Sequence, residues 1–322
     1  MKEKLIDLVN PINQLYLYGY KKYFDLFIEL FKSGKLPNCT LLSGQKGIGK
    51  STFAYHFINS IFSKDENYEY SLKNYKINEL NYSYNQIINE THSNFFQIVS
   101  DNTNSQIKID QSRNLINFLS KTTYKKNFKL VLIDNIESLN ISASNAILKS
   151  LEEPSNNTFF FLVHDNSYPL LETIKSRCMI FKINFSESEK KDIFQNLIKE
   201  NYSDQSHINI NDDLYFNTPG NLLHQNLIIK KLKTDNQLDI LNLINIFLNE
   251  FSETKNIQIL NYASFYIEKF YTDLFINKAK AQSTSLNNFN KILNQINFIK
   301  KFNINEKNSF IWIKDILQHE TR

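Results

Sequence analysis

The feature that most constrains this chain is a glycine-rich turn placed between an apolar run and a helical pattern. Residues Gly44–Ser51 read G-x-x-x-x-G-K-S, and they follow the apolar run Cys39–Leu42. Apolar side chains at helical spacing begin at Thr52 and continue to Phe62. In this order of strand, glycine turn and helix, backbone N–H groups can wrap a phosphate chain. The sequence therefore predicts a nucleotide-binding loop, called the glycine-rich loop below, with the binding residues Gly44, Gly47, Ile48, Gly49, Lys50, Ser51 and Thr52.

Charged and hydroxyl groups in this region predict how a nucleotide would be held. We expect Lys50 to neutralise β- and γ-phosphate charge and Ser51 to ligate Mg²⁺. A second apolar run, 130–133, ends in Asp134, whose carboxylate would hold the same Mg²⁺ through water. The expected cofactor is ATP or ADP with Mg²⁺. The motif alone leaves open a glycine turn with a chance lysine, or a loop that stays empty.

Strand-like and helix-like segments alternate over the first part of the chain. Short β-type apolar runs fall at 39–42, 95–99, 130–133, 159–163 and 179–181. Several of them are apolar on both faces, as the strands of a covered parallel sheet are. Helical spacing falls at 52–62, at 110–119 with Asp110 as the expected N-cap, and at 142–152 before Pro154. This alternation predicts an α/β domain with a parallel sheet.

Strand signals stop after Ile183, and the remaining chain has helical patterns. We expect an α/β module over 1–182, a small helical unit over 183–228 and a larger helical unit over 229–322. The larger unit includes helices such as Leu238–Phe251 and Ile257–Ala281. A polar, tyrosine-rich segment at about 63–92 interrupts the first module and is expected to be a surface insertion.

Composition limits the class of protein and its location. The chain has 322 residues, of which 42% are hydrophobic, which suits two or three domains and excludes a wholly disordered chain. No run approaches the ~18 apolar residues of a membrane span. Cys39 and Cys178 are too few for a disulfide framework or a structural zinc site, so we expect no zinc and a reduced, cytoplasmic location. The net charge of +4 neither requires nor excludes nucleic acid.

The stretch between Asp134 and Cys178 is the most specific part of the sequence. It contains A-S-N-A-I-L-K-S-L-E-E-P at 143–154 and S-R-C at 176–178. With these blocks the chain resembles the AAA+ clamp-loader subunits of bacterial DNA polymerase III, most strongly over residues 11–182. The resemblance implies an AAA+ P-loop module, then a helical lid over 183–228 and a helical collar over 229–322 that joins a hetero-pentameric ring.

Within that family the chain resembles the delta-prime branch more than the motor branch. Motor subunits carry an aspartate-glutamate pair and a cysteine-rich zinc module, whereas here Asn135 follows Asp134 and the insertion contains no cysteine. His164 stands where motor subunits have threonine, and 218–222 lacks a nucleotide-sensing arginine. These departures imply a site that binds ATP without turning it over. Rescue by Glu137 as the base stays open, although a continuing strand would aim its side chain elsewhere.

The chain has three arginines, Arg113, Arg177 and Arg322. The resemblance implies that Arg177 is a catalytic arginine finger in trans, which reaches the γ-phosphate bound by a neighbouring motor subunit. A surface ion pair is the alternative for Arg177. The resemblance also implies that Lys108 contacts the phosphate backbone of DNA. The alternative is that Lys108 lies on a helix face that contacts only solvent. We expect Cys178 to be a small buried residue with no chemical role.

Together these inferences predict a stator and arginine-finger donor that helps to load a sliding clamp onto primed DNA. The implied partners are gamma/tau and delta subunits, the sliding clamp and primer-template DNA, with no membrane. The chain is not expected to hydrolyse ATP itself, although it would belong to the DNA polymerase III holoenzyme. One alternative is an active gamma/tau-like motor ATPase. Another is a P-loop kinase or transferase, which gives no account of the block at 176–178.

Overall fold

A computed structural model describes residues 10–99, 106–123, 126–155, 157–201, 217–231, 239–277, 283–302 and 306–320. The chain divides into two compact units between Leu227 and Ile228. The first unit contains the α/β part together with the helices of the expected lid. The second contains the C-terminal helices. A separate lid domain with boundaries near 183 and 228 stays a prediction.

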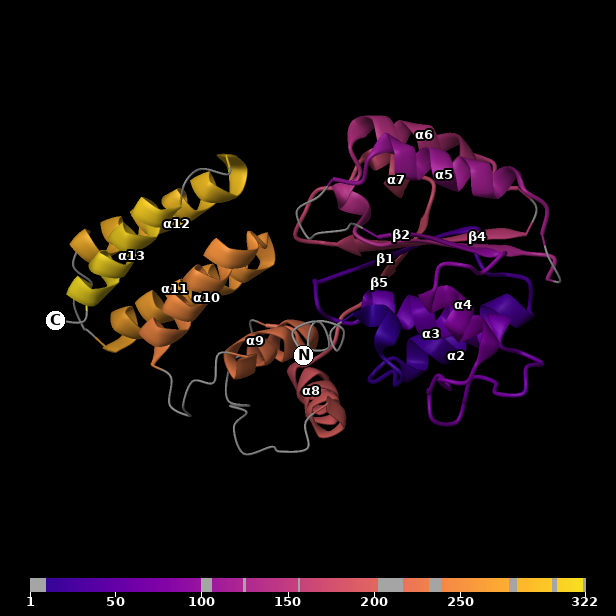
Figure 1. Ribbon diagram of the computed structural model, residues 1–322, viewed down its shortest axis with the longest axis horizontal. Helices are drawn as coiled ribbons and strands as arrows, with labels where there is room; N and C mark the ends of the chain where they lie inside the picture. The colour runs from indigo at the N-terminus through magenta and orange to yellow at the C-terminus, as the bar shows by residue number, and fades with distance from the viewer. Residues whose placement is uncertain are drawn as a thin grey trace. The chain divides into compact units, whose positions relative to one another are not determined.

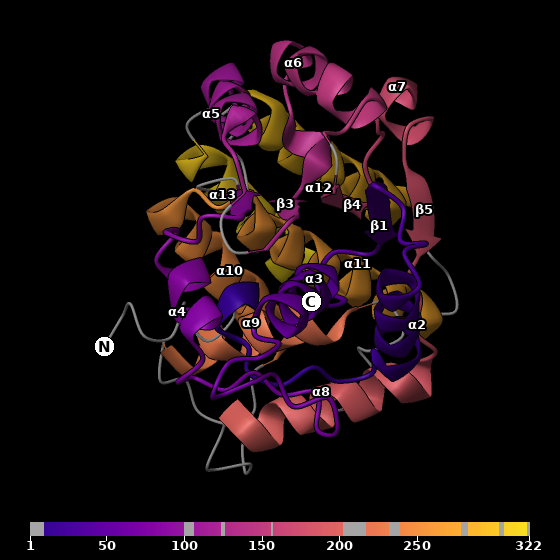
Figure 2. The ribbon, with the colours of Figure 1, turned by 90° about the vertical axis from the view of Figure 1, so that its right-hand side faces the viewer.

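The first unit is built on five parallel strands, which confirms the expected α/β class with a parallel sheet. They are β1 (Cys39–Gly44), β2 (Phe95–Ile98), β3 (Lys129–Ile133), β4 (Thr158–Asp165) and β5 (Met179–Lys182), in the order β2-β3-β4-β1-β5. In Figure 2, β3, β4, β1 and β5 follow one another across the sheet. Gly44 pairs with Asp165, so the carboxyl ends of β1 and β4 lie side by side. In open α/β sheets this is the edge where ligands bind.

Helices cover both faces of the sheet (Figure 1). One face carries α5 (Ile109–Ser120), α6 (Ile141–Glu152) and α7 (Glu172–Lys175), and the other carries α2 (Lys21–Lys32), α3 (Lys50–Phe62) and α4 (Tyr82–Ile88). Strand side chains alternate between the two layers. Leu41 packs in the core beside α5 and α6, whereas Leu42 packs in the core beside α2 and α3. Burial on both sides explains the apolar runs within β1, β3 and β4. The edge strand β5 is instead mostly exposed, with Met179 at 56% and Ile180 at 42%.

Helix α5 begins in a different way from the sequence prediction. Its N-cap is Lys108, and Asp110 lies within the first turn. The side chain of Gln111 accepts a hydrogen bond from the Lys108 backbone N–H at 3.1 Å, so this residue supplies the cap from inside the helix. Asp110 instead pairs with Arg113 at 3.2 Å on the exposed side. The prediction of Asp110 as the N-cap was therefore wrong.

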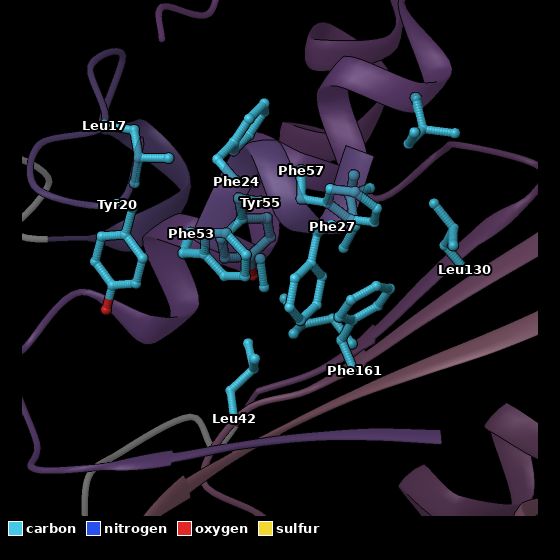
Figure 3. Packing of buried hydrophobic residues seen from close by; sticks show 14 of the residues in the cluster. Leu17, Tyr20, Phe24, Phe27, Leu42, Phe53, Tyr55, Phe57, Leu130 and Phe161 are labelled. Atoms are coloured by element: carbon cyan, nitrogen blue, oxygen red, sulfur yellow. The ribbon is translucent and has the colours of Figure 1, made fainter. Parts of the chain in front are cut away.

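Aromatic rings fix α3 between α2 and the sheet (Figure 3). Phe27 on α2 lies 5.1 Å from Phe53 and 5.6 Å from Phe57, measured between ring centroids. Phe57 in turn lies 5.3 Å from Phe161 on β4. The two contacts of Phe27 are edge-to-face, and contacts of that kind each contribute about 0.5–1.5 kcal/mol beyond the burial of apolar area. Since α3 starts at Lys50, this packing also fixes the end of the glycine-rich loop.

The insertion does not lie only at the surface. Its side chains Tyr70, Ile77, Tyr84 and Ile87 are buried in the same core as α2 and α3. Asn81 caps α4 by accepting from the Tyr84 backbone N–H at 2.7 Å. The sequence hid this role because single apolar residues are spread among many polar ones. The expectation of a surface insertion was therefore wrong for these four side chains.

The remaining described elements are helical. In the first unit they are the 3₁₀ helices η1 (Pro11–Asn13) and η2 (Ile136–Ser138), with α8 (Glu187–Asn201). Helix α9 (Pro219–Lys231) begins in the first unit and ends in the second. The second unit contains α10 (Ile240–Thr254), α11 (Ile257–Asn277), α12 (Ser283–Phe302) and α13 (Lys307–Glu320) around one apolar core. The two helices expected there are confirmed as α10 and α11; Leu238 and 278–281 lie outside the described residues. Among the described helices, none has the length and apolar character needed to span a membrane.

Candidate nucleotide-binding site

The glycine-rich loop joins β1 to α3, as the sequence predicted. Its bend depends on left-handed backbone at Gly47 and Gly49, where φ is +79° and +96°. Gly49 is also the residue before the first turn of α3. Because a side chain disfavours these angles, glycine is needed at both positions. The loop therefore has the backbone form from which N–H groups and a helix N-terminus can face an anion.

The two residues expected to hold Mg²⁺ lie together. The Ser51 side chain makes a hydrogen bond to the Asp134 carboxylate, which also accepts from the Asn135 backbone N–H at 3.0 Å. Burial raises the pKa of Asp134, and its bond to Ser51 and the nearby Lys50 charge oppose that shift. In the described part of the chain, no group of three or more His, Cys, Asp or Glu side chains forms a metal site. A cation here would need phosphate oxygens as further ligands, which is how Mg²⁺ is usually bound beside nucleotides.

The Lys50 ammonium is bonded to the loop itself. Its Nζ donates to the Gly44 carbonyl at 2.7 Å and to the Gln45 carbonyl at 2.6 Å, and the residue is only 5% exposed. Burial lowers the pKa of Lys50 to about 8, and the neighbouring carboxylates counter this effect. A phosphate would compete with these two carbonyls for the same ammonium. The loop thus holds its lysine in place by bonds that a stronger acceptor could replace.

Glu137 lies closer to this site than the sequence suggested. Strand β3 ends at Ile133, and Asn135 takes a left-handed conformation with φ +55°. The chain then turns into η2, and the Glu137 Oε2 accepts from the Asp165 backbone N–H at 3.2 Å. Burial raises the pKa of Glu137 to about 7. The expectation that a continuing strand would aim Glu137 elsewhere was wrong, because the strand stops before it.

His164 is held by its own chain at the end of β4. Its Nε2 lies 3.0 Å from the Tyr168 carbonyl, and its Nδ1 lies 3.1 Å from the Ser43 hydroxyl. Since a carbonyl only accepts, Nε2 carries the proton and Nδ1 accepts from Ser43. Both ring nitrogens are therefore used within the protein. The next residue, Asp165, is one of three carboxylates, with Asp134 and Glu137, whose charges raise the pKa of Lys46 and Lys50 against the effect of burial.

The first turn of α9 contacts the outer side of the glycine-rich loop. Thr218 Oγ1 donates to the Lys46 carbonyl at 2.7 Å, and the Gly220 backbone N–H donates to the Gly47 carbonyl at 2.9 Å. A Cβ on Gly220 would stand 2.7 Å from that same Gly47 oxygen, so the close approach requires glycine. Residues 218–222 entered the sequence analysis only because they lack a nucleotide-sensing arginine. Their contacts with the loop use main-chain atoms, the Thr218 hydroxyl and the Asn221 side-chain amide, which donates to the Lys46 carbonyl at 3.4 Å.

A small cavity of about 80 Å³ lies beside the glycine-rich loop. The residues that line the cavity outside the loop were not identified by the sequence analysis. Its lining includes Tyr16, Tyr18, Gly47, Ile193, Leu197 and Leu223. Thr52 and Ile48 also face it. The hydroxyl of the lining residue Tyr18 donates to Glu200 at 2.8 Å. The alternating tyrosines at 16, 18 and 20 were the one sequence signal for this wall.

Arg177 contacts the end of α6 and not the glycine-rich loop. Its Nε donates to Glu152 Oε1 at 2.8 Å, its Nη2 also bonds that oxygen, and its Nη1 donates to the Thr173 carbonyl at 2.6 Å. The ion pair considered as an alternative for Arg177 therefore exists. An ion pair within the subunit leaves the role in trans as a prediction.

The two cysteines form a disulfide that the sequence analysis did not expect. Cys39, the first residue of β1, is bonded to Cys178, and their Cα atoms are 4.7 Å apart. The expectation of reduced cysteines was therefore wrong. Cys178 is partly buried against the core that contains α5 and α6. The bond fixes the residue after Arg177 to the sheet. Their separation of 139 residues gave no local signal for it.

Lys108 and Arg113 lie on the exposed start of α5. Arg113 pairs with Asp110, and both side chains are more than half exposed. Exposed pairs of this kind contribute at most about 1 kcal/mol. The contact of Lys108 with a nucleic acid backbone stays a prediction.

Comparison with known proteins identifies the relatives of this chain. Residues 19–187 match the family model described as DNA polymerase III, delta subunit. A DNA polymerase III subunit delta′ from Pseudomonas aeruginosa is 34% identical over 154 residues, which are 48% of this chain and 45% of the relative. A DNA polymerase III subunit gamma from Buchnera aphidicola is 30% identical over 165 residues, which are 51% of this chain and 42% of the relative. Each alignment thus spans less than half of the relative's own length.

Among solved structures, a DNA polymerase III gamma subunit-related protein from Thermotoga maritima aligns with a TM-score of 0.48 at 16% identity. The alignment covers 92% of this chain and 99% of that one.

Proposed function

The chain belongs to the DNA polymerase III delta subunit family, and from that membership we propose that it serves as a delta-prime-type clamp-loader subunit. In this role it binds a nucleotide without hydrolysing it, acts as a rigid stator and offers Arg177 to a neighbouring motor subunit. One observation carries the proposal: the two expected Mg²⁺ ligands, Ser51 and Asp134, interact directly, but the next residue is Asn135 where hydrolysis needs a carboxylate. An amide cannot accept a proton as a general base.

The residues at the glycine-rich loop fit ATP or ADP with Mg²⁺. Backbone N–H groups at Gly47, Ile48 and Gly49 would bind phosphate oxygens, and Lys50 would leave its loop carbonyls to neutralise their charge. Ser51 and Asp134 would hold the cation, with Thr52 at the wall of the adjoining cavity. When bound, Mg²⁺ would neutralise phosphate charge. The chain's own contribution is to bind and orient the nucleotide.

A second function, the active gamma/tau-like motor, is favoured by one specific observation. Glu137 lies at the ends of β3 and β4, and burial brings its pKa to about 7, the range that suits a general base. Against it, Glu137 Oε2 is already bonded to the Asp165 N–H, and His164 has both ring nitrogens engaged. No observation favours a P-loop kinase or transferase.

The assembly that we propose is a hetero-pentamer with gamma/tau and delta subunits. The α10–α13 unit would join the ring as a collar, and α8 and α9 would form the lid. The assembly would act on the sliding clamp and primer-template DNA. The guanidinium of Arg177 would stabilise charge on the phosphoryl group at the neighbour's site, because its planar fork can donate two parallel hydrogen bonds.

ATP turnover by the purified chain separates the two functions. We expect nucleotide binding, followed by fluorescence of a labelled ADP, but no release of phosphate above background. Glu137→Gln and Lys50→Ala are the matched variants. Robust hydrolysis that disappears in both variants would replace the stator with the motor function.

A further inference from the structure

The hydrogen bonds of Arg177 leave a defined part of its guanidinium available. The group carries five N–H donors in a fixed plane. Glu152 Oε1 takes the Nε–H and one N–H of Nη2, and the Thr173 carbonyl takes one N–H of Nη1. The second N–H of Nη2 therefore has no partner among the described contacts, and the second N–H of Nη1 has only the Ser176 Oγ, a weak contact at 3.4 Å. These two N–H groups form the outer fork, which is the edge that binds a phosphate with two parallel bonds.

Glu152 reaches Arg177 from a rigid support. It is the last residue of α6, and the preceding Leu151, with Ile147 one turn earlier, is buried in the core against the sheet. The C-terminal end of a helix also carries partial negative charge, which favours a cation beside it. On the other side, Ile174 is fully buried and the Cys39–Cys178 disulfide fixes the residue that follows Arg177. Both ends of the Glu152–Arg177 contact are thus anchored in the same core.

We propose that Glu152 is a positioning residue, which holds the Arg177 guanidinium by its inner edge so that its outer fork projects toward a phosphate on a neighbouring subunit. The inference rests on the proposed arginine-finger function. A long arginine side chain has many rotamers, and fixing one of them before docking lowers the entropy that docking must remove. A carboxylate is suited to this task because one oxygen can accept from both Nε and Nη2.

Chemical labelling of the isolated chain tests the contact without any partner. Phenylglyoxal modifies accessible guanidinium groups, and peptide mass spectrometry can follow Arg177 and Arg113 separately. We expect Glu152→Ala to raise the labelling rate of Arg177 about threefold, the release expected of a half-exposed ion pair, and to leave Arg113 unchanged. Glu153→Ala is the matched control, because the contacts described for Arg177 include Glu152 and not its neighbour. An unchanged Arg177 rate in Glu152→Ala would overturn the proposal.

Reconstituted loader activity tests the consequence. With gamma/tau-type subunits, a delta subunit, the clamp and primed DNA, we expect Glu152→Ala to lower kcat for ATP about 10-fold, as a small misplacement of a catalytic group does. The KM for ATP should not change, because the neighbour's own loop binds the nucleotide. Glu152→Gln keeps one acceptor oxygen and should stay within about threefold of wild type, and Glu153→Ala should match wild type.

The outcomes separate the two ideas. If Arg177→Ala has no effect on turnover, the arginine-finger function fails and the inference fails with it. If Arg177→Ala abolishes turnover while Glu152→Ala matches or exceeds wild type, only the positioning role of Glu152 is wrong. A parallel fall for Glu152→Ala and Glu153→Ala would also overturn it, since that result reports general charge loss.

Discussion

The glycine-rich loop and the Arg177 region carry the two chemistries of the first unit, and they are built in opposite ways. The carbonyls of Gly44 and Gln45 are bonded by Lys50, those of Lys46 and Gly47 by α9, and that of Ile48 by the Tyr20 hydroxyl at 3.1 Å. Arg177, by contrast, lies at the surface and keeps two N–H groups without a strong partner. The difference suggests that the loop is complete within one chain, whereas the arginine requires a second chain.

The largest expected effect concerns the arginine. Arg177→Ala should lower ATP turnover of the reconstituted loader by about 10³- to 10⁵-fold, because the charge that stabilises the neighbour's phosphoryl group is lost. Nucleotide affinity of the isolated chain should not change, which equilibrium titration can check. Arg113→Ala is the control. A fall in the chain's own affinity would mean that the two regions are not independent.

Removal of the disulfide should have the next largest effect. Reduction should lower the free energy of unfolding of the first unit by about 2–4 kcal/mol, because the bond closes a long loop in the unfolded chain. Thermal unfolding with and without a reductant measures this effect. Cys39→Ser and Cys178→Ser should both unfold at the temperature of the reduced protein and ignore the reductant. A wild-type protein that ignores the reductant contradicts the bond.

Loss of the loop lysine should affect the nucleotide alone. Lys50→Ala should weaken ADP binding by up to about 100-fold, since a charged hydrogen-bond donor to phosphate contributes about 1.5–3 kcal/mol. Calorimetric titration measures this change, and exposed Lys73→Ala is the control. Unaltered affinity in Lys50→Ala would indicate that the loop does not bind the nucleotide.

The smallest effect is a pH dependence behind the loop. His56 on α3 is buried between the Tyr70 hydroxyl, 3.0 Å from Nδ1, and the Gln14 carbonyl, 2.9 Å from Nε2. Burial lowers the pKa of His56 to about 3, against an ordinary value of 6.5. Below pH 6.5 the unfolded chain therefore binds a proton that the folded chain does not, and this contribution to stability falls by about 1.4 kcal/mol per pH unit down to about pH 3.

Urea unfolding at pH 7.5, 6.5 and 5.5 measures that slope. His56→Gln should lower the dependence of the unfolding free energy on pH by about 1.4 kcal/mol per pH unit, which corresponds to one proton. His319→Gln, a substitution at an exposed position, should leave the dependence unchanged. Burial also lowers the pKa of His92 to about 4 and lowers the pKa of His164, so both contribute in the same direction. Glu137 acts in the opposite direction, because burial raises its pKa to about 7. Equal slopes for wild type and His56→Gln would show that His56 is not buried in its neutral form.

The sequence predicted features that local patterns encode. The glycine-rich loop depends on consecutive residues, and the all-apolar runs marked the strands because both faces of the sheet are covered. The position of Asp134 near the glycine-rich loop was also predictable, because the carboxyl ends of parallel strands lie at the same edge of a sheet. Contacts between distant segments were not predictable. The Glu152–Arg177 pair, the Cys39–Cys178 bond and the buried tyrosines of the insertion all depend on tertiary packing.

Glu137 shows why one site residue was misjudged. Its position depends on where β3 stops and on a left-handed residue at Asn135, and both are backbone choices that the apolar pattern does not mark. Asparagine is among the few residues that tolerate this conformation. Asn135, which stands where a catalytic glutamate was expected, is thus also the residue whose left-handed backbone lets the chain turn toward Glu137.

The bonds from Lys50 to Gly44 and Gln45 have a kinetic consequence. An arriving nucleotide meets an ammonium that is already engaged, so the complex cannot tighten until those two bonds open. We therefore expect the observed binding rate to rise with nucleotide concentration and then level off at the opening rate of the lysine. Stopped-flow fluorescence would measure that plateau. The plateau rate should be the same for different nucleotides, because it is set by the opening of the Lys50 bonds in the empty loop.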